Sequence, residues 1–154
     1  MSTTFDSLQD LLWDDPESAK PHLESLVSEN NADAMCVLAM GYYDGDFGDR
    51  DTAKAAELLE SAVALGSPKA AHDLGCFKYY GYGFESGFRD VARAVELIES
   101  GVSSGHVPSM VFLAALLESG DEVNADLDRA IELYRLAASQ GDAEAKDALS
   151  RLEK

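Results

Sequence analysis

The sequence predicts an all-α protein: an α-solenoid, wound as a right-handed superhelix of stacked antiparallel helix pairs, with about nine helices. The prediction rests on three classes of position that recur along the 154 residues with the same separations of 36, 39 and 36. They are an alanine (Ala19, Ala55, Ala94, Ala130), a turn residue (Asn30, Gly66, Gly105, Gly141) and a leucine (Leu38, Leu74, Leu113, Leu149). A period of 20–50 residues is typical of stacked supersecondary units.

The chain begins with a predicted cap and half-repeat, residues 1–31. Residues 5–13 are expected to form a short helix, and a lone second helix is expected at about 16–30. Asp15 can accept hydrogen bonds from the free N–H groups of that helix, and Pro16 is tolerated in its first turn. Pro21 lies inside the segment, so we expect a helix that is kinked or that starts later.

Three complete helix pairs are predicted next, at residues 32–67, 68–106 and 107–141. In each pair the second helix has an Asp four residues before the repeated Ala: Asp51, Asp90 and Asp126. An Asp there can cap the helix, and the glycine eleven residues beyond the Ala can end it in a left-handed conformation. The segments "AAELLESAVAL", "AVELIESGVSS" and "AIELYRLAASQ" show apolar residues at intervals of three and four, which is typical of amphipathic helices.

The first helix of each pair is predicted in "DAMCVLAMGYY", "KAAHDLGCFKYY" and "PSMVFLAALLES". A small residue follows the repeated leucine in each copy, at Ala39, Gly75 and Ala114. Because glycine inside a helix costs about 1 kcal/mol relative to alanine, Gly75 is expected to have a packing reason. Residues 142–154 are predicted to form a C-terminal capping helix with a polar outer face, as a terminal repeat needs.

The composition narrows the classes of partner. Twelve Lys and Arg stand against 29 Asp and Glu, a formal net charge of −17. Nucleic-acid binding is excluded on this basis, because it needs a cationic face. The first ten residues contain no Lys or Arg and no long apolar run, so we expect neither a secretory signal nor a membrane anchor, and no membrane association. Two cysteines favour a reduced, cytoplasmic setting, and a monomer or weak dimer is expected.

Catalytic and metal-binding patterns are weak. The stretch "DGDFGDRD" suggests a calcium loop, but Asp49 and Ala55 stand at the sixth and twelfth places, where Gly and Glu are required. The three histidines have no zinc-ligand spacing, and no nucleophile elbow is present. A His72–Cys76 pair could share one helix face, yet an ordinary surface location is the simpler interpretation. We therefore predict a non-enzyme with no metal and no cofactor.

The repeated segments resemble the Sel1-like repeats, relatives of the tetratricopeptide repeats. The resemblance rests on "LAMGYYDGDFG", "LGCFKYYGYGF" and "LAALLESGDEVNADLDRAIELYRLAASQG" and covers roughly residues 32–154. It implies an adaptor that assembles other proteins. Some secreted bacterial members of the family carry a disulfide in every repeat and have been linked to β-lactam binding, but this chain lacks those paired cysteines.

The resemblance also implies that the first helices of the pairs line a concave groove. An insertion in "YGFESGFR", between Gly81 and Asp90, adds a candidate loop. Residues with large, adaptable or polar-tipped side chains suit contact with a partner. The predicted partner-binding residues are Cys36, Met40, Tyr43, Asp44, His72, Cys76, Tyr79, Tyr80, Tyr82 and Phe84.

The acidity favours a basic protein or peptide as the occupant of this groove, because charge complementarity steers association. Within the class of interaction modules, size and charge suit an immunity or antitoxin protein that occludes a basic toxin domain. The alternative is an enzyme or small-molecule binder, with a β-lactam-like ligand, that uses the Tyr- and His-lined groove.

Overall fold

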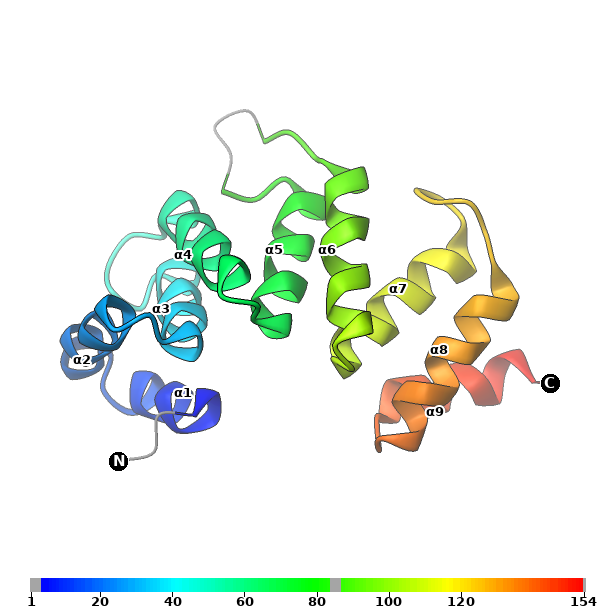
Figure 1. Ribbon diagram of the computed structural model, residues 1–154, viewed down its shortest axis with the longest axis horizontal. Helices are drawn as coiled ribbons and strands as arrows, with labels where there is room; N and C mark the ends of the chain where they lie inside the picture. The colour runs from blue at the N-terminus through cyan, green and yellow to red at the C-terminus, as the bar shows by residue number, and fades with distance from the viewer. Residues whose placement is uncertain (1–3, 84–86, 154) are drawn as a thin grey trace.

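The computed structural model describes residues 4–83 and 87–153 of the chain. Within these ranges it consists of nine α-helices and no strand, and the helices follow one another along an arc with the termini at its two ends (Figure 1). The helices are α1 (Phe5–Asp14), α2 (Pro16–Ser28), α3 (Ala32–Asp44), α4 (Thr52–Ala64), α5 (Pro68–Tyr80), α6 (Val91–Ser103), α7 (Val107–Ser119), α8 (Leu127–Ser139) and α9 (Ala143–Leu152). The predicted all-α solenoid is confirmed.

The predicted helix caps are present in every repeat. The carboxylates of Asp15, Asp51, Asp90 and Asp126 each accept a hydrogen bond from the backbone N–H three residues later, at the starts of α2, α4, α6 and α8. These bonds satisfy N–H groups that a helix start leaves without an intrahelical partner.

The predicted left-handed turn residues follow the same four helices. Gly66, Gly105 and Gly141 have φ values of 84°, 79° and 99°. Asn30 is the only described non-glycine residue with positive φ, at 61°. Asparagine tolerates this conformation better than most residues, which explains why it can stand in the glycine position of the first copy.

One prediction about the first half-repeat needs correction. The helix α2 starts at Pro16, directly after its cap Asp15, and continues through Pro21 to Ser28. The alternative that it starts later is therefore wrong. Proline removes an N–H donor inside the helix, but Pro21 is exposed, so water can reach the carbonyl group that loses its partner.

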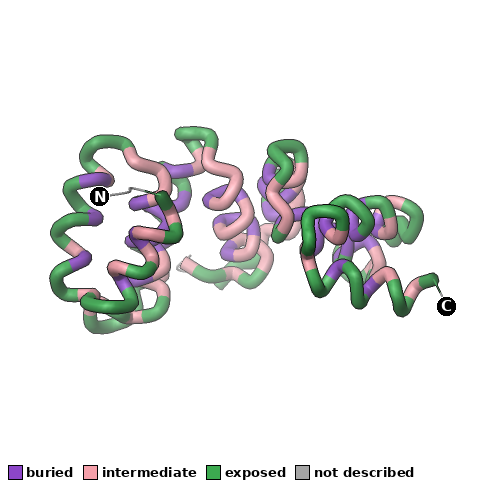
Figure 2. Tube along the Cα trace, turned by 90° about the horizontal axis from the view of Figure 1, so that it is seen from below, coloured by how far each residue is buried: buried purple, intermediate pink, exposed green. Residues whose placement is uncertain are grey.

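The core lies between the helices in two clusters of buried side chains. One cluster extends from α1 to α6 and contains Leu23 and Leu97, and the other extends from α6 to α9 and contains Ile98 and Leu113. The four repeated alanines are all fully buried. Figure 2 shows the buried residues where neighbouring helices face one another.

Gly75 has the packing reason that was expected. A Cβ atom at this position would lie 2.8 Å from Cδ1 of Ile98 and 3.3 Å from the carbonyl oxygen of Ala94. The absence of a side chain at Gly75 therefore lets α5 and α6 approach each other closely.

Polar contacts fasten the C-terminal helix. The guanidinium group of Arg151 on α9 donates to both carboxylate oxygens of Glu118 on α7. The hydroxyl of Tyr134 on α8 donates to the same carboxylate across 3.1 Å. Hydrogen bonding by Arg151 lowers the pKa of Glu118, so this carboxylate stays ionised and joins the last three helices.

Candidate functional site

The odd-numbered helices are the first helices of the repeats together with α1 and α9, and we call the surface that they make the A-helix face. Two cavities are lined mainly by residues of these helices. The first has a volume of about 400 Å³, and α1, α3 and α5 supply most of its walls. It is lined by Phe5, Cys36, Ala39, Met40, Tyr43, Leu59, Lys69, Asp73, Cys76, Phe77, Tyr80 and Tyr82.

An aromatic cluster forms one wall of the first cavity. The ring centroids of Tyr43, Phe77 and Tyr82 lie 5.2 to 5.9 Å apart, with tilted or edge-to-face geometry. Tyr80 stacks on Tyr82 at 5.6 Å. Such offset and edge contacts are favourable for aromatic rings, so the wall is held by its own packing. Tyr80 and Tyr82 remain 51% and 41% exposed and can offer their rings to a partner.

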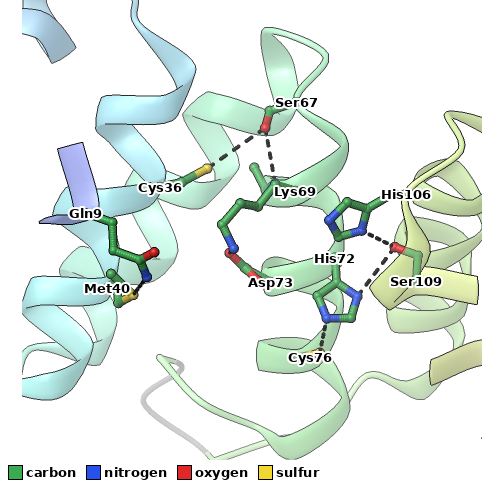
Figure 3. A network of polar contacts seen from close by, with 11 residues as sticks. Gln9, Cys36, Met40, Ser67, Lys69, His72, Asp73, Cys76, His106 and Ser109 are labelled. Carbon is green, nitrogen blue, oxygen red and sulfur yellow. Dashed lines mark hydrogen bonds and ion pairs between the residues drawn. The ribbon is translucent and has the colours of Figure 1, made fainter. Parts of the chain in front are cut away.

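The charged groups of the first cavity are paired with each other. The ammonium group of Lys69 lies 3.3 Å from the carboxylate of Asp73, one helical turn away on α5. It also lies 4.3 Å from the centre of the Phe5 ring, a cation–π contact. The thioether of Met40 is contacted by the side-chain amide of Gln9 on α1 at 3.5 Å. Figure 3 shows the contacts of Lys69 with Asp73 and of Gln9 with Met40.

The second cavity lies on the other side of α5 and has a volume of about 610 Å³. The helices α5 and α7 supply most of its walls, and Asp142 and Glu144 at the start of α9 complete it. Its lining consists of His72, Tyr79, Tyr80, Pro108, Val111, Phe112, Ala115, Leu116, Ser119, Asp142 and Glu144. Tyr80 lines both cavities and forms the ridge between them.

Two imidazole rings meet beside the second cavity. The centroids of His72 on α5 and His106 before α7 are 5.2 Å apart. The hydroxyl of Ser109, which is fully buried, lies 2.9 Å from Nδ1 of His106 and 3.4 Å from Nδ1 of His72 (Figure 3). A hydroxyl can both donate and accept, so one oxygen can satisfy both rings at the junction of two repeats.

Burial keeps both histidines neutral and both cysteines protonated. Burial lowers the pKa of His72 to about 4 and that of His106 to about 4, so both imidazoles are neutral near pH 7. Burial raises the pKa of the Cys76 thiol to about 12, although its sulfur lies 3.7 Å from Nε2 of His72. A reactive cysteine needs a lowered thiol pKa. Burial likewise raises the pKa of Cys36 to about 11, and both cysteines are free thiols.

Eight of the ten predicted contact residues line one or both cavities. Cys36, Met40, Tyr43, Cys76 and Tyr82 lie at the first, His72 and Tyr79 lie at the second, and Tyr80 lies at both. Asp44 is exposed beside Tyr43 and belongs to neither lining. Phe84 lies outside the described residues, as do the next two residues of the insertion loop.

Two predicted residues have environments that limit their contact with a partner. Cys36 is only 2% exposed, and its sulfur lies 3.9 Å from the Ser67 hydroxyl. It therefore forms part of the cavity wall with little surface to offer. Tyr79 is partly covered from within the chain, because the guanidinium group of Arg89 lies 4.9 Å from its ring centre.

Sequence reasoning missed several residues of the site. Phe5 reaches the first cavity from α1, and no local pattern indicates that α1 packs beside α3. Asp73 and Phe112 lie in helices that the sequence predicts, but their positions at the cavities follow from packing. His106 and Ser109 carried a usable signal, since a side chain three residues into a helix lies close to the residue that caps the helix.

Neither a metal-binding cluster nor a membrane-spanning helix is found in the described part of the chain. Among residues 4–83 and 87–153, no group of three or more His, Cys, Asp or Glu side chains is arranged to hold a metal ion. Within the same ranges, no helix is long and apolar enough to cross a membrane.

Comparisons with known proteins agree on the fold. The Sel1 repeat family profile matches residues 32–67, 68–106 and 107–142. A Sel1 repeat protein from Oxalobacter formigenes superposes with a TM-score of 0.81 at 20% identity, over 92% of this chain and 57% of that one. A protective antigen of uropathogenic Escherichia coli with an SLR fold superposes with a TM-score of 0.80 at 21% identity, over 97% of this chain and 34% of that one. No curated protein matches.

The chain thus spans 57% and 34% of the lengths of these two solved structures, and at such low identity they show the fold alone. Sel1 repeats generally mediate protein–protein interaction, and proteins built from them are typically non-catalytic. Because the three matched segments account for most of its 154 residues, the chain belongs to the Sel1 repeat family.

Proposed function

We propose that this chain is a non-catalytic interaction module that holds a basic protein or peptide on its A-helix face. The observation that carries the proposal is the gathering of eight predicted contact residues around two adjoining cavities on that face. Aromatic, thioether and imidazole groups combine apolar area with polar tips, which is typical of the residues that dominate binding energy.

The charge distribution supports a basic partner. At least eight of the 12 basic side chains are engaged in ion pairs inside the chain: Lys54, Lys69, Lys78, Arg89, Arg93, Arg129, Arg135 and Arg151. Those pairs occupy eight of the 29 acidic residues. The surplus of carboxylates is thus available to attract positive charge from outside.

The test is a kinetic comparison with a partner captured from the native host and then purified. Asp44→Lys is expected to slow association and to flatten its salt dependence, because long-range attraction acts mainly on encounter. Tyr79→Ala or Tyr80→Ala is expected to speed dissociation, with a cost of about 2 kcal/mol for a hot-spot residue.

Glu132→Lys is the matched charge control, since Glu132 is exposed on α8, outside both cavities. A normal dissociation rate with both tyrosines replaced would place the interface elsewhere. A partner as acidic as this chain would overturn the electrostatic half of the proposal.

An immunity or antitoxin role is the finer form of the same proposal. A small acidic chain can neutralise a basic toxin domain by covering its surface, and the expected setting is the cytoplasm. The neighbouring genes supply the test, because co-expression of this chain should restore growth to cells that produce a toxic neighbour. Growth arrest in the presence of the folded chain would refute this role and leave the interaction module intact.

A further inference from the structure

We propose that the two cavities select different side chains of one extended partner segment: the first takes a large apolar side chain, and the second takes a lysine or arginine. The inference rests on the proposed function, because it assigns a chemistry to each part of the same face. It goes beyond that function by stating which kinds of residue the partner must present, and in what arrangement.

The first cavity suits an apolar side chain. Phe5, Met40, Leu59 and Phe77 contribute apolar surface to its lining, and its volume of about 400 Å³ can admit a leucine, methionine or aromatic side chain. Burial of such a side chain removes apolar surface from water and is therefore favourable. The two charged groups of the lining, Lys69 and Asp73, are already paired with each other.

A cation in the first cavity is disfavoured, although aromatic rings line it. An aromatic cage needs separated rings that surround the charge, whereas the centroids of Tyr43, Phe77 and Tyr82 are 5.2 to 5.9 Å apart and fill the space between them. Lys69 also lines this cavity and already neutralises Asp73, so the charged groups of the lining carry no net negative charge that would hold a second cation.

The charged groups that line the second cavity are all negative. Its lining contains the carboxylates of Asp142 and Glu144 and no lysine or arginine. Asp142 caps α9 by accepting a hydrogen bond from the N–H of Ala145, across 2.8 Å to Oδ1, and Glu144 is exposed in the first turn. The apolar side chains of Val111, Phe112 and Ala115 can cover the methylene stem of a lysine or arginine, whose charged end then reaches the carboxylates.

The ridge between the cavities constrains the partner's backbone. Tyr80 lines both cavities, so a segment that fills both must cross its half-exposed ring. In an extended chain successive side chains point to opposite faces, and alternate ones point to the same face. The apolar and the basic anchor are therefore expected two or four positions apart.

The experiment is a selection of random dodecapeptides, displayed on phage, against the immobilised full chain. The wild-type protein is expected to enrich peptides that pair a large apolar residue with Lys or Arg at a separation of two or four. The selection is repeated on Tyr82→Ala and Met40→Ala, which alter the first cavity, and on Glu144→Gln and Glu144→Lys, which alter the second. Glu132→Lys serves as the control.

The separate loss of each preference is the decisive result. The first-cavity variants should lose selection for the apolar position and keep the basic one. The Glu144 variants should lose the basic position and keep the apolar one. For one selected peptide, each change should weaken affinity about tenfold or more, and Glu132→Lys should leave it unchanged. Two first-cavity variants are used so that one unfolded protein does not decide the outcome.

The failures of the two proposals can be distinguished. The two-cavity assignment is wrong if peptides bind the A-helix face but both classes of variant change the preference at the same peptide position. It is also wrong if the Glu144 variants change the preference for the apolar residue. In either case the proposal that the A-helix face binds a partner is retained. If no peptide is enriched, the two-cavity assignment falls, and if enriched peptides ignore every variant of this face, the proposed function falls with it.

Discussion

A single serine hydroxyl serves two imidazole rings at the junction of the second and third repeats. Ser109 is completely buried, and Gly101 on α6 leaves the space that it occupies, since a Cβ at Gly101 would lie 3.0 Å from the Cβ of Ser109. The neutral state of His72 and His106 follows from burial, which lowers both pKa values to about 4. These residues link α5, α6 and α7 through polar groups that must stay uncharged.

The first prediction concerns His72 and acid. Its pKa is lowered on folding from 6.5 to about 4, so the unfolded chain binds more protons between these values, and the free energy of unfolding falls as the pH falls through that window. His72→Gln removes this dependence. Relative to the variant, the wild-type protein should lose about 2 to 3 kcal/mol of stability between pH 7 and pH 4.

Urea denaturation at a series of pH values measures this difference. Between pH 7 and pH 8 both proteins carry a neutral side chain at position 72, and the difference should be constant, which supplies the internal control. Burial raises the pKa of Asp73, an effect of opposite sign on the acid side that both proteins share. A difference that stays constant down to pH 4 would show that His72 is not buried neutral.

The second prediction concerns the close approach at Gly75. Gly75→Ala gains helix propensity of about 1 kcal/mol but places a Cβ against Ile98 and the carbonyl of Ala94. Overpacking of this kind costs about 1–3 kcal/mol, so we expect net destabilisation. Ile98→Val removes the atom closest to the new Cβ, and the double variant should recover part of the loss in a double-mutant cycle. Full additivity of the two changes would contradict the contact.

At the scale of the element, the same capping scheme builds four helices. Each of α2, α4, α6 and α8 starts at an Asp whose carboxylate accepts a backbone N–H, and each is followed by a left-handed residue. Among the first helices of the three repeats, α3 and α5 are capped by the side chains of Asn31 and Ser67, whereas the N-cap His106 of α7 makes no side-chain cap hydrogen bond. Its ring nitrogen Nδ1 is instead directed to Ser109, which explains the exception.

The third prediction concerns the cap of α8. Asp126→Ala should lower the free energy of unfolding by about 0.5–2 kcal/mol, because the N–H of Arg129 loses its partner at 3.0 Å. Asp128→Ala is the matched control: it removes a carboxylate from the first turn of the same helix without removing the cap. Chemical denaturation compares the two variants. An equal loss from both would mean that charge near the helix start, and not the cap hydrogen bond, supplies the stability.

At the scale of the whole molecule, the core is divided along the chain. The first buried cluster contains Leu97 and the second begins with Ile98, so α6 is the helix that belongs to both. In a solenoid each repeat contacts its neighbours, and stability is approximately a sum over repeats and interfaces. The two ends of the arc in Figure 1 are therefore expected to open separately.

The fourth prediction tests this division with a matched pair of core substitutions. Leu113→Ala in α7 and Leu23→Ala in α2 each remove a side chain that is at most 1% exposed and should cost about 2–5 kcal/mol. In native-state hydrogen exchange, Leu113→Ala should speed exchange in α7, α8 and α9, and Leu23→Ala in α1, α2 and α3. Uniform acceleration along the whole chain in both variants would indicate one cooperative unit.

Local signals predicted the helices well. Asp51 and Gly66 delimit α4 because a cap and a left-handed stop act within a few residues of the helix they bound. The insertion between Gly81 and Asp90 was recognised by length, but three of its residues lie outside the described part of the chain. The alternative that Pro21 delays the start of α2 was wrong, because a proline on an exposed helix face can be accommodated inside the helix.

The candidate site was predicted as a set of residues and not as an arrangement. Met40 and Tyr80 were expected on one face by repeat register, and the structure places both at the first cavity. The division of the face at Tyr80, the approach of Phe5 from α1 and the sharing of Ser109 by two histidines were not foreseeable. They depend on how far each helix pair is rotated and displaced relative to the next.

The sequence by itself determined the all-α repeat architecture, the places where helices begin and end, and the excess of negative charge. These properties follow from hydrogen bonds and apolar spacing within one or two helical turns, or from composition alone. The tertiary structure alone decided that the A-helix face carries two cavities of unlike lining, with Lys69 and Asp73 at one and Asp142 and Glu144 at the other. The physical reason is that a cavity forms where side chains from helices distant in sequence fail to fill the space between them, and the angles between packed helix pairs set that space.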